Sequence, residues 1–119
     1  MAKIMLVEDD ATMVTLLTTL LKMDGFEVLP LDPDQDVPAA VKRGDPDVLL
    51  LDVHLSNQDG LRILDTLRQS DDTRHTYVIM ISGMNVREEC MRRGADAFLL
   101  KPFMPDDLMN LLKQARHVP

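Results

Sequence analysis

The sequence predicts an α/β fold in which strands and helices alternate and the helices cover both faces of a parallel sheet. Five short apolar segments, each followed by polar or turn-forming residues, are separated by segments with the apolar spacing of helices. The third of them is apolar at almost every position, which is typical of a central parallel strand buried on both faces. Right-handed crossovers should then bring the carboxyl ends of the strands to one edge of the sheet.

The N-terminal part of the chain predicts a strand over residues 3–7 (KIMLV) and a helix over residues 11–23. Glycine at position 25 provides a C-terminal cap for this helix. The inner face of the helix is assigned from apolar residues at the i, i+3, i+4, i+7 spacing, which are Met13, Leu16, Leu17 and Leu20.

A second strand is predicted over residues 26–29, and the proline- and aspartate-rich segment 30–38 is predicted to be a loop. Only a short helix, over residues 39–43, is expected before the third strand.

The C-terminal half repeats the alternation more clearly. The predicted strands are 48–53, 77–81 and 97–100. Between them we expect a helix that contains Leu61, Ile63, Leu64 and Leu67, and a short helix over residues 86–93. A last helix begins at Pro105, a favoured first-turn residue, and its inner face consists of Leu108, Leu111, Leu112 and Ala115.

Length and composition indicate one domain over residues 1–119, with 45% apolar residues to form its core. The formal charge of −7, from 20 acidic and 13 basic residues, argues against nucleic acid and membrane surfaces as partners. The single cysteine, Cys90, and the absence of an N-terminal apolar run favour a cytoplasmic location.

Chemically active side chains lie at or directly after the ends of four of the predicted strands: Glu8-Asp9, Asp52, Ser82 and Lys101. Carboxylates that meet at one sheet edge repel each other, and a divalent cation such as Mg²⁺ or Mn²⁺ relieves that repulsion. One carboxylate can then attack phosphorus to give an acyl phosphate, while a lysine and a hydroxyl offset the charge of the transferred group.

A purely structural role is the alternative for most of these residues. An acidic pair after a strand often belongs to a helix N-terminus, a lysine can extend from a strand end to solvent, and a serine can cap a turn. Asp52 differs because it lies in an apolar run, where an unpaired carboxylate is unfavourable, so a functional role is favoured for it.

Over nearly its whole length the chain resembles the receiver domains of two-component response regulators. The resemblance implies a doubly wound, flavodoxin-like (βα)5 fold with strand order 2-1-3-4-5. It also implies that Asp52 accepts a phosphoryl group from a histidine kinase or phosphotransfer protein, and that the domain then switches conformation and signals to an effector domain or protein. Catalysis would be limited to the domain's own phosphotransfer and autodephosphorylation, so the protein is not expected to be an enzyme.

The resemblance also implies a Mg²⁺ site. Asp9 corresponds to the direct metal ligand and Glu8 to the assisting acid, while the acceptor Asp52 and the backbone carbonyl of His54 complete the set.

Other positions correspond to the family's phosphate-binding and switching residues. Ser82 takes the hydroxyl position and Lys101 the phosphate-binding lysine, and both would act in phosphotransfer together with Asp52. Ser82 and Phe98 correspond to the switch residues, although core packing is the default role for Phe98 and its switching role rests on the resemblance. The peptide bond before Pro102 is expected to be cis. Ser56 departs from the family, which often has proline four residues after the acceptor.

Three alternatives stay open at this point. A phosphohydrolase with an aspartyl-phosphate intermediate usually has a second aspartate two residues after the nucleophile, where this chain has His54. A flavodoxin-like cofactor binder would need a first loop that attracts phosphate, which the acidic residues 8–10 would repel. The third is a receiver that binds partners without being phosphorylated.

Overall fold

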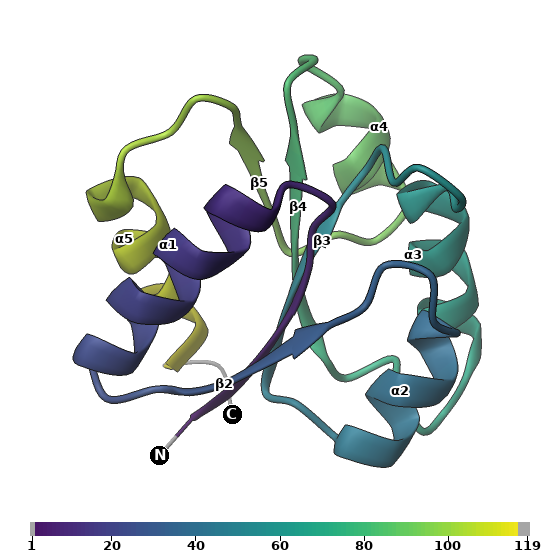
Figure 1. Cartoon of the computed structure of the whole chain (residues 1–119). Coiled ribbons are helices and arrows are strands. Elements are labelled where there is room, and N and C mark those ends of the chain that lie inside the picture. The colour runs from purple at the N-terminus through teal and green to yellow at the C-terminus, as the bar shows by residue number, and fades with distance from the viewer. Residues whose placement is uncertain (1, 117–119) are drawn as a thin grey trace.

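Five parallel strands form the centre of the molecule in the computed structural model, which describes residues 2–116 (Figure 1). The strands are β1 (Lys3–Val7), β2 (Glu27–Leu31), β3 (Val48–Asp52), β4 (Tyr77–Ser82) and β5 (Ala97–Leu100). Their order across the sheet is β2-β1-β3-β4-β5, so the direction of winding reverses between β1 and β3. The predicted doubly wound, flavodoxin-like fold is therefore confirmed.

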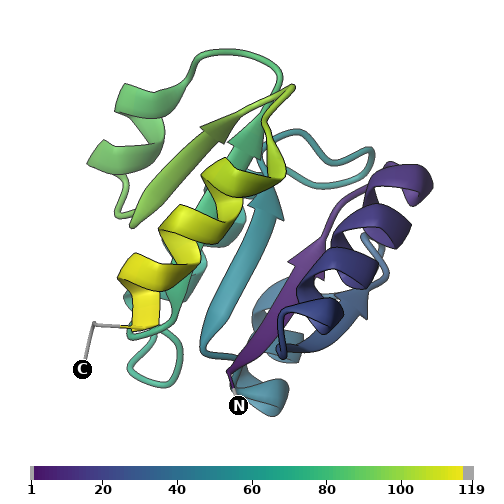
Figure 2. The same ribbon diagram turned by 90° about the vertical axis from the view of Figure 1, so that its left-hand side faces the viewer.

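Helices cover both faces of this sheet (Figures 1 and 2). They are α1 (Ala11–Met23), α2 (Val37–Gly44), α3 (Gly60–Gln69), α4 (Arg87–Arg92) and α5 (Pro105–Arg116). Helices α1 and α5 pack on one face, and α2, α3 and α4 lie on the other. None of the helices within residues 2–116 has the length and apolar character needed to cross a membrane.

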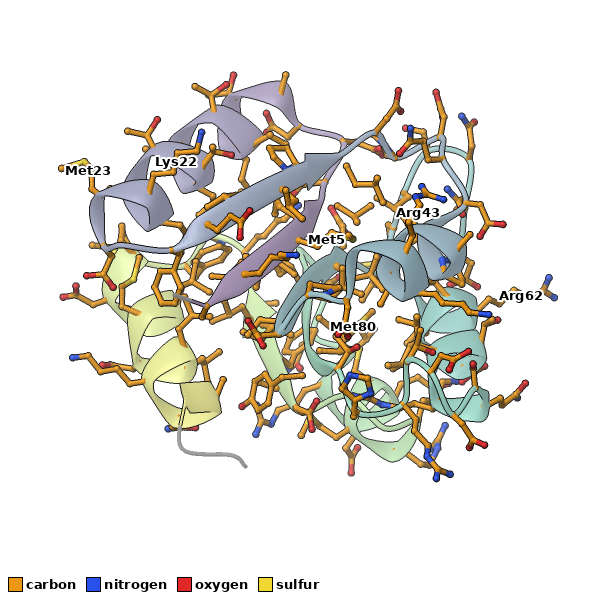
Figure 3. All side chains as sticks on the ribbon, turned by 90° about the horizontal axis from the view of Figure 1, so that it is seen from below. Met5, Lys22, Met23, Arg43, Arg62 and Met80 are labelled. Atoms are coloured by element: carbon orange, nitrogen blue, oxygen red, sulfur yellow. The ribbon has the colours of Figure 1, made fainter. Side chains whose placement is uncertain are left out.

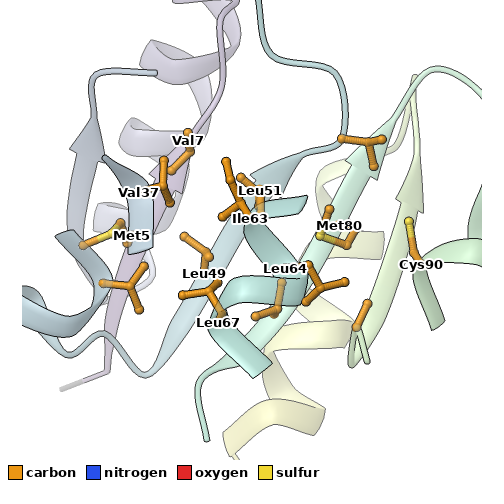
Figure 4. Close-up of a cluster of buried hydrophobic side chains, with 14 of the residues drawn as sticks. Met5, Val7, Val37, Leu49, Leu51, Ile63, Leu64, Leu67, Met80 and Cys90 are labelled. Atoms are coloured by element: carbon orange, nitrogen blue, oxygen red, sulfur yellow. The ribbon is translucent and has the colours of Figure 1, made fainter. Parts of the chain in front are cut away.

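Two apolar clusters, one on each face of the sheet, form the core. Along β1, Ile4 and Leu6 pack under α1 and α5, whereas Met5 and Val7 pack under α2 and α3. This alternation follows from the two-residue repeat of a strand, and it explains why β3 is buried at every position. Figure 4 shows the cluster under α2 and α3, and in Figure 3 Met5 and Met80 lie inside the fold while Arg62 extends outward.

Two element boundaries on the β2 side differ from the prediction. Strand β2 continues to Leu31 and includes Pro30, which lies in a segment predicted to be a loop. A residue without an amide hydrogen is tolerated there because β2 is an edge strand. Helix α2 is also longer than predicted, because Pro38 fits its first turn and the Asp36 side chain accepts a hydrogen bond from Ala39 N.

The inner face of α1 was predicted incorrectly in one respect. The buried residues of this helix are Leu17 and Leu21, whereas Leu16 is 55% exposed. Met13 and Val14 complete the buried side as partly covered residues. The buried stripe therefore runs through Met13, Leu17 and Leu21 at i, i+4 steps. The spacing of apolar residues in the sequence also allowed a neighbouring stripe through Leu16, so it did not decide between the two.

Aspartates that cap two helices fix the chain near the carboxyl edge of the sheet. Asp10 Oδ1 accepts hydrogen bonds from Thr12 N at 2.9 Å and Met13 N at 3.2 Å, so it begins α1. Asp59 Oδ1 accepts one from Leu61 N at 2.9 Å and begins α3 in the same way. Asp10 therefore caps a helix, a structural role that distinguishes it from Glu8 and Asp9.

Candidate functional site

The site lies at the carboxyl edge of the sheet, where the loops after β1, β3, β4 and β5 meet. Asp52 is the last residue of β3, Ser82 is the last residue of β4, and Glu8 directly follows β1. Lys101 directly follows β5, and its amide donates a hydrogen bond to Ser82 O at 2.8 Å. The parallel register therefore brings these four residues, distant in sequence, to one place, as predicted.

Lys101 joins the two buried carboxylates of the site. Its Nζ atom lies 2.6 Å from Glu8 Oε1 and 2.8 Å from Asp52 Oδ2. Glu8 is 4% exposed and Asp52 is 5% exposed, so both side chains are largely withdrawn from water. Two buried acids thus share one cationic partner, and the group carries excess negative charge when both are ionised.

The pKa values of Glu8 and Lys101 reflect this arrangement. Burial, and next the hydrogen bond with Asp52, raise the pKa of Glu8 above its ordinary value, although Lys101 acts in the opposite direction. For Lys101, burial lowers the pKa, but the hydrogen bonds and charges of Asp52 and Glu8 outweigh burial, so the net pKa is raised. Lys101 is therefore a fixed positive charge beside Asp52 at neutral pH.

The backbone and Ser82 complete the surroundings of Asp52. Asp52 Oδ1 accepts a hydrogen bond from His54 N at 3.0 Å, while Oδ2 is the atom that contacts Lys101. Ser82 is fully buried, and its Oγ accepts a hydrogen bond from Met84 N at 3.0 Å. The same Oγ lies 3.5 Å from Nδ1 of the His54 ring. The side chain of His54 therefore reaches Ser82, a contact that nothing in the sequence pattern indicated.

Asp9 does not join the two buried acids. Its Oδ2 accepts hydrogen bonds from Ser56 N at 2.6 Å and Ser56 Oγ at 2.8 Å, in the loop between β3 and α3. Within residues 2–116, no three His, Cys, Asp or Glu side chains are grouped in the way that holds a metal ion. Ser56 was noted in the sequence as a departure from the family's proline, and this contact with Asp9 was not predicted.

The chemistry of the acids nevertheless suits a divalent cation. Glu8 Oε1 is buried and, among the residues that the structure describes, has Lys101 as its partner in an ion pair and receives no other hydrogen bond. Oxygen ligands with excess negative charge are those that Mg²⁺ takes in proteins. The residues present therefore fit the predicted metal, provided that Asp9 moves toward Glu8 and Asp52.

The predicted switch residue and proline both lie next to this site. Phe98 in β5 is 8% exposed and packs in the cluster under α3 and α4, beside Met80 of β4. The peptide bond between Lys101 and Pro102 is cis. Phe98 therefore packs in the core, where it pairs with Met80 of β4.

A cavity of about 600 Å³ lies away from this site, at the opposite edge of the sheet. It is bordered by residues that precede β3 and β4, such as Pro46 and Thr76, and by the last part of α5. None of the predicted site residues borders it. The predicted site residues therefore lie apart from this cavity, at the edge where the carboxyl ends of the strands meet.

Comparisons with known proteins identify the family. The sequence model of the response regulator receiver domain matches residues 4–113, and the chain belongs to this family of two-component signalling proteins. Phosphorylation and Mg²⁺ binding are general features of the family.

Among curated relatives, the cell cycle response regulator CtrA of Brucella abortus is 33% identical over 110 residues, which cover 90% of this chain and 47% of CtrA. The probable transcriptional regulator ycf27 of Porphyridium aerugineum is 27% identical over 106 residues, which cover 89% of this chain and 44% of that protein. The chain therefore spans less than half the length of these relatives.

Solved structures show the same fold. A putative response regulator from Chloroflexus aurantiacus superposes with a TM-score of 0.88 at 26% identity, over 96% of each chain. The receiver domain of the sensor histidine kinase PA1611 from Pseudomonas aeruginosa superposes with a TM-score of 0.84 at 24% identity, over 95% of each chain. The PA1611 crystal structure has a magnesium ion coordinated in its active site cleft.

Neutralising Glu8 is expected to stabilise the metal-free chain. In Glu8→Gln, Lys101 keeps Asp52 as its partner and the unfavourable buried charge is removed, so the free energy of unfolding should rise by about 1 kcal/mol at pH 7.5. The raised pKa of Glu8, caused first by burial, means that the folded state holds its proton more tightly than the unfolded state.

Stability should therefore fall as pH rises from the ordinary glutamate pKa through the higher folded value, and stay reduced above it. The gain from Glu8→Gln should accordingly vanish below the ordinary glutamate pKa, because Glu8 is then protonated in both the folded and the unfolded state. Urea unfolding at a series of pH values measures this, and Glu27→Gln, at an exposed position of β2, is the control. A loss of stability at pH 7.5 would show that the ion pair with Lys101 outweighs the burial of the charge.

Proposed function

We propose that Asp52 accepts a phosphoryl group and that the domain relays this modification as a signal. The observation that carries the proposal is the contact of Lys101 Nζ with Asp52 Oδ2 at 2.8 Å in a buried site. A cation at this distance can offset the charge of a phosphoryl group as it transfers. The donor would be a histidine kinase or a phosphotransfer protein, which are the donors implied by the family.

The residues of the chain suit the individual tasks of this transfer. An Asp52 carboxylate oxygen attacks phosphorus and forms the new bond from oxygen to phosphorus. The bond from phosphorus to the donor breaks, and its electron pair leaves with the donor. Lys101 stays beside the transferred group because its raised pKa keeps it protonated. Ser82, at the end of β4 with its Oγ atom 3.5 Å from Nδ1 of His54, is the residue proposed to contact a phosphoryl oxygen.

Glu8, Asp9, Asp52 and the backbone carbonyl of His54 are the proposed holders of Mg²⁺, with Mn²⁺ as a substitute. When bound, the metal would neutralise charge on the transferred phosphoryl group. To contribute, Asp9 has to exchange its hydrogen bonds with Ser56 for the cation.

Ser82 and Phe98 are the proposed switch. Movement of the buried Ser82 side chain toward the phosphoryl group would open space between β4 and β5, and Phe98 would repack into it. The signal would pass to an effector domain or a separate protein. The proposed catalysis is limited to phosphotransfer to Asp52 and loss of the phosphoryl group. With these partners and a buried, unpaired Cys90, the proposed location is the cytoplasm.

The proposal predicts metal-dependent phosphorylation by a small donor. Incubation with acetyl phosphate and MgCl2 should add one phosphoryl group per chain, visible in the intact mass. Excess chelator should prevent the addition, because the charge on the transferred group is then offset by Lys101 alone. Hydroxylamine should remove the group, since it cleaves acyl phosphates and leaves phosphoserine intact.

A chain that takes up no phosphoryl group with Mg²⁺ or Mn²⁺ would contradict the proposal. That result would favour a receiver that binds its partners without phosphorylation. Uptake that is unaffected by chelator would remove the metal from the proposal.

A further inference from the structure

Ser56 binds the carboxylate that is proposed to hold the metal directly. Both donors of this residue, the backbone amide and the hydroxyl, contact the same atom, Asp9 Oδ2, at 2.6 Å and 2.8 Å. Hydrogen bonds to an ionised carboxylate are stronger than those between neutral groups. Ser56 therefore provides a specific resting position for the side chain of Asp9.

This resting position keeps Asp9 apart from the other acids. Glu8 and Asp52 both face Lys101 Nζ, whereas Asp9 faces the loop between β3 and α3. The grouping of three acidic side chains that would hold a metal is accordingly missing from the described part of the chain. Asp9 must leave at least part of its contact with Ser56 before it can bind a cation together with Asp52.

The loop that carries Ser56 is itself held in place. Asn57 Nδ2 donates a hydrogen bond to Asp34 Oδ1. Gln58 Nε2 donates to the backbone oxygens of Pro33 at 2.5 Å and Gln35 at 2.8 Å. These contacts anchor the loop to the segment between β2 and α2. Because the loop is anchored there, it does not follow Asp9 freely, so movement of Asp9 Oδ2 toward Glu8 and Asp52 breaks its hydrogen bonds with Ser56.

We propose that Ser56 sets the metal affinity of this domain by competing with the cation for Asp9. The inference rests on the proposed Mg²⁺ site. Each hydrogen bond that Asp9 gives up subtracts from the free energy of metal binding, so the wild-type chain binds Mg²⁺ more weakly than its acidic residues would otherwise allow. Ser56 acts as a positioning residue, through Asp9, and does not contact the phosphoryl group.

Two substitutions remove the competing donors one after the other. Ser56→Ala removes the hydroxyl and keeps the amide, and Ser56→Pro removes both. Titration calorimetry with MgCl2 on the whole chain should give an affinity roughly threefold higher for Ser56→Ala and about tenfold higher for Ser56→Pro. Ser56→Gly is a second variant without the hydroxyl, and it should match Ser56→Ala even if proline distorts the loop.

Asn57→Ala is the matched control, because it removes one side-chain contact of the loop, leaves both Ser56 donors in place, and keeps the loop anchored through the two hydrogen bonds of Gln58. It should change the affinity much less than Ser56→Ala, and Asp9→Asn should abolish binding. An affinity that is unchanged or reduced in both Ser56→Ala and Ser56→Gly would overturn the inference and leave the metal site intact. A reduced affinity would show that Ser56 orients Asp9 for the metal. Absence of Mg²⁺ binding in the wild type and in every variant would overturn both the inference about Ser56 and the proposed Mg²⁺ site.

Discussion

Asp52→Asn should lower phosphorylation of the chain by acetyl phosphate by at least about 100-fold, because the amide that replaces the carboxylate is not a nucleophile. Asparagine has the size of aspartate and can still accept the hydrogen bond from His54 N. Lys101 keeps Glu8 as its ionic partner in this variant. The fold and the remaining charges should therefore be preserved, so that loss of label reports the loss of the acceptor.

The rate of phosphoryl uptake, followed by intact mass, measures this effect. Asp24→Asn, at the exposed C-terminal cap of α1, is the control and should be phosphorylated like the wild type. Thermal unfolding of Asp52→Asn should show no loss of stability, since one of two mutually repelling buried acids is removed. Phosphoryl uptake by Asp52→Asn equal to that of the wild type would show that another residue is the acceptor.

Gly60→Ala should destabilise the fold by roughly 3 kcal/mol or more, because a Cβ atom at this position would overlap backbone atoms. An added Cβ would lie 2.3 Å from Asp52 O, 2.8 Å from Val53 Cα and 2.9 Å from Val53 O. Backbone atoms at the end of a central strand cannot move aside as a flexible side chain would. Gly60 is the first residue of α3, so the overlap must displace this helix or the end of β3.

The same overlap should impair the site, because Asp52 and the loop that carries His54 belong to the displaced segment. Urea unfolding gives the stability, and acetyl phosphate labelling gives the effect on the site. Gly83→Ala is the matched control: a Cβ there meets no atom within 4 Å, and the stability should change by less than about 0.5 kcal/mol. A Gly60→Ala chain as stable as the control would show that the tight packing of α3 on β3 is not required.

Much of the fold could be predicted because its strands are buried on both faces. Such strands are nearly continuous apolar runs, and β1 and β5 were predicted with the bounds that the structure shows. The elements at the β2 edge were harder to predict. An edge strand accepts a proline and has mixed burial, so Pro30 was assigned to a loop, and the helix that begins before Pro38 was predicted too short.

The site was predictable to the extent that it depends on strand ends. Parallel topology brings Glu8, Asp52, Ser82 and Lys101 together whatever the details of the loops, so their positions followed from the sequence pattern. The contacts of Asp9 with Ser56 and of His54 with Ser82 depend on the conformation of loops and side chains. The periodicity and spacing of residues in the sequence do not determine how loops and side chains are arranged. These two contacts could therefore be found only in the structure.

The most direct test of the central claim is to locate the phosphoryl group on the wild-type chain. The chain is phosphorylated with acetyl phosphate and MgCl2, reduced with borohydride to convert an acyl phosphate into a stable alcohol, and digested for peptide mass spectrometry. We predict a single modified residue, Asp52, which becomes homoserine. Modification at Asp9, Glu8 or any other residue, with Asp52 unchanged, would contradict the assignment of Asp52 as the phosphoryl acceptor.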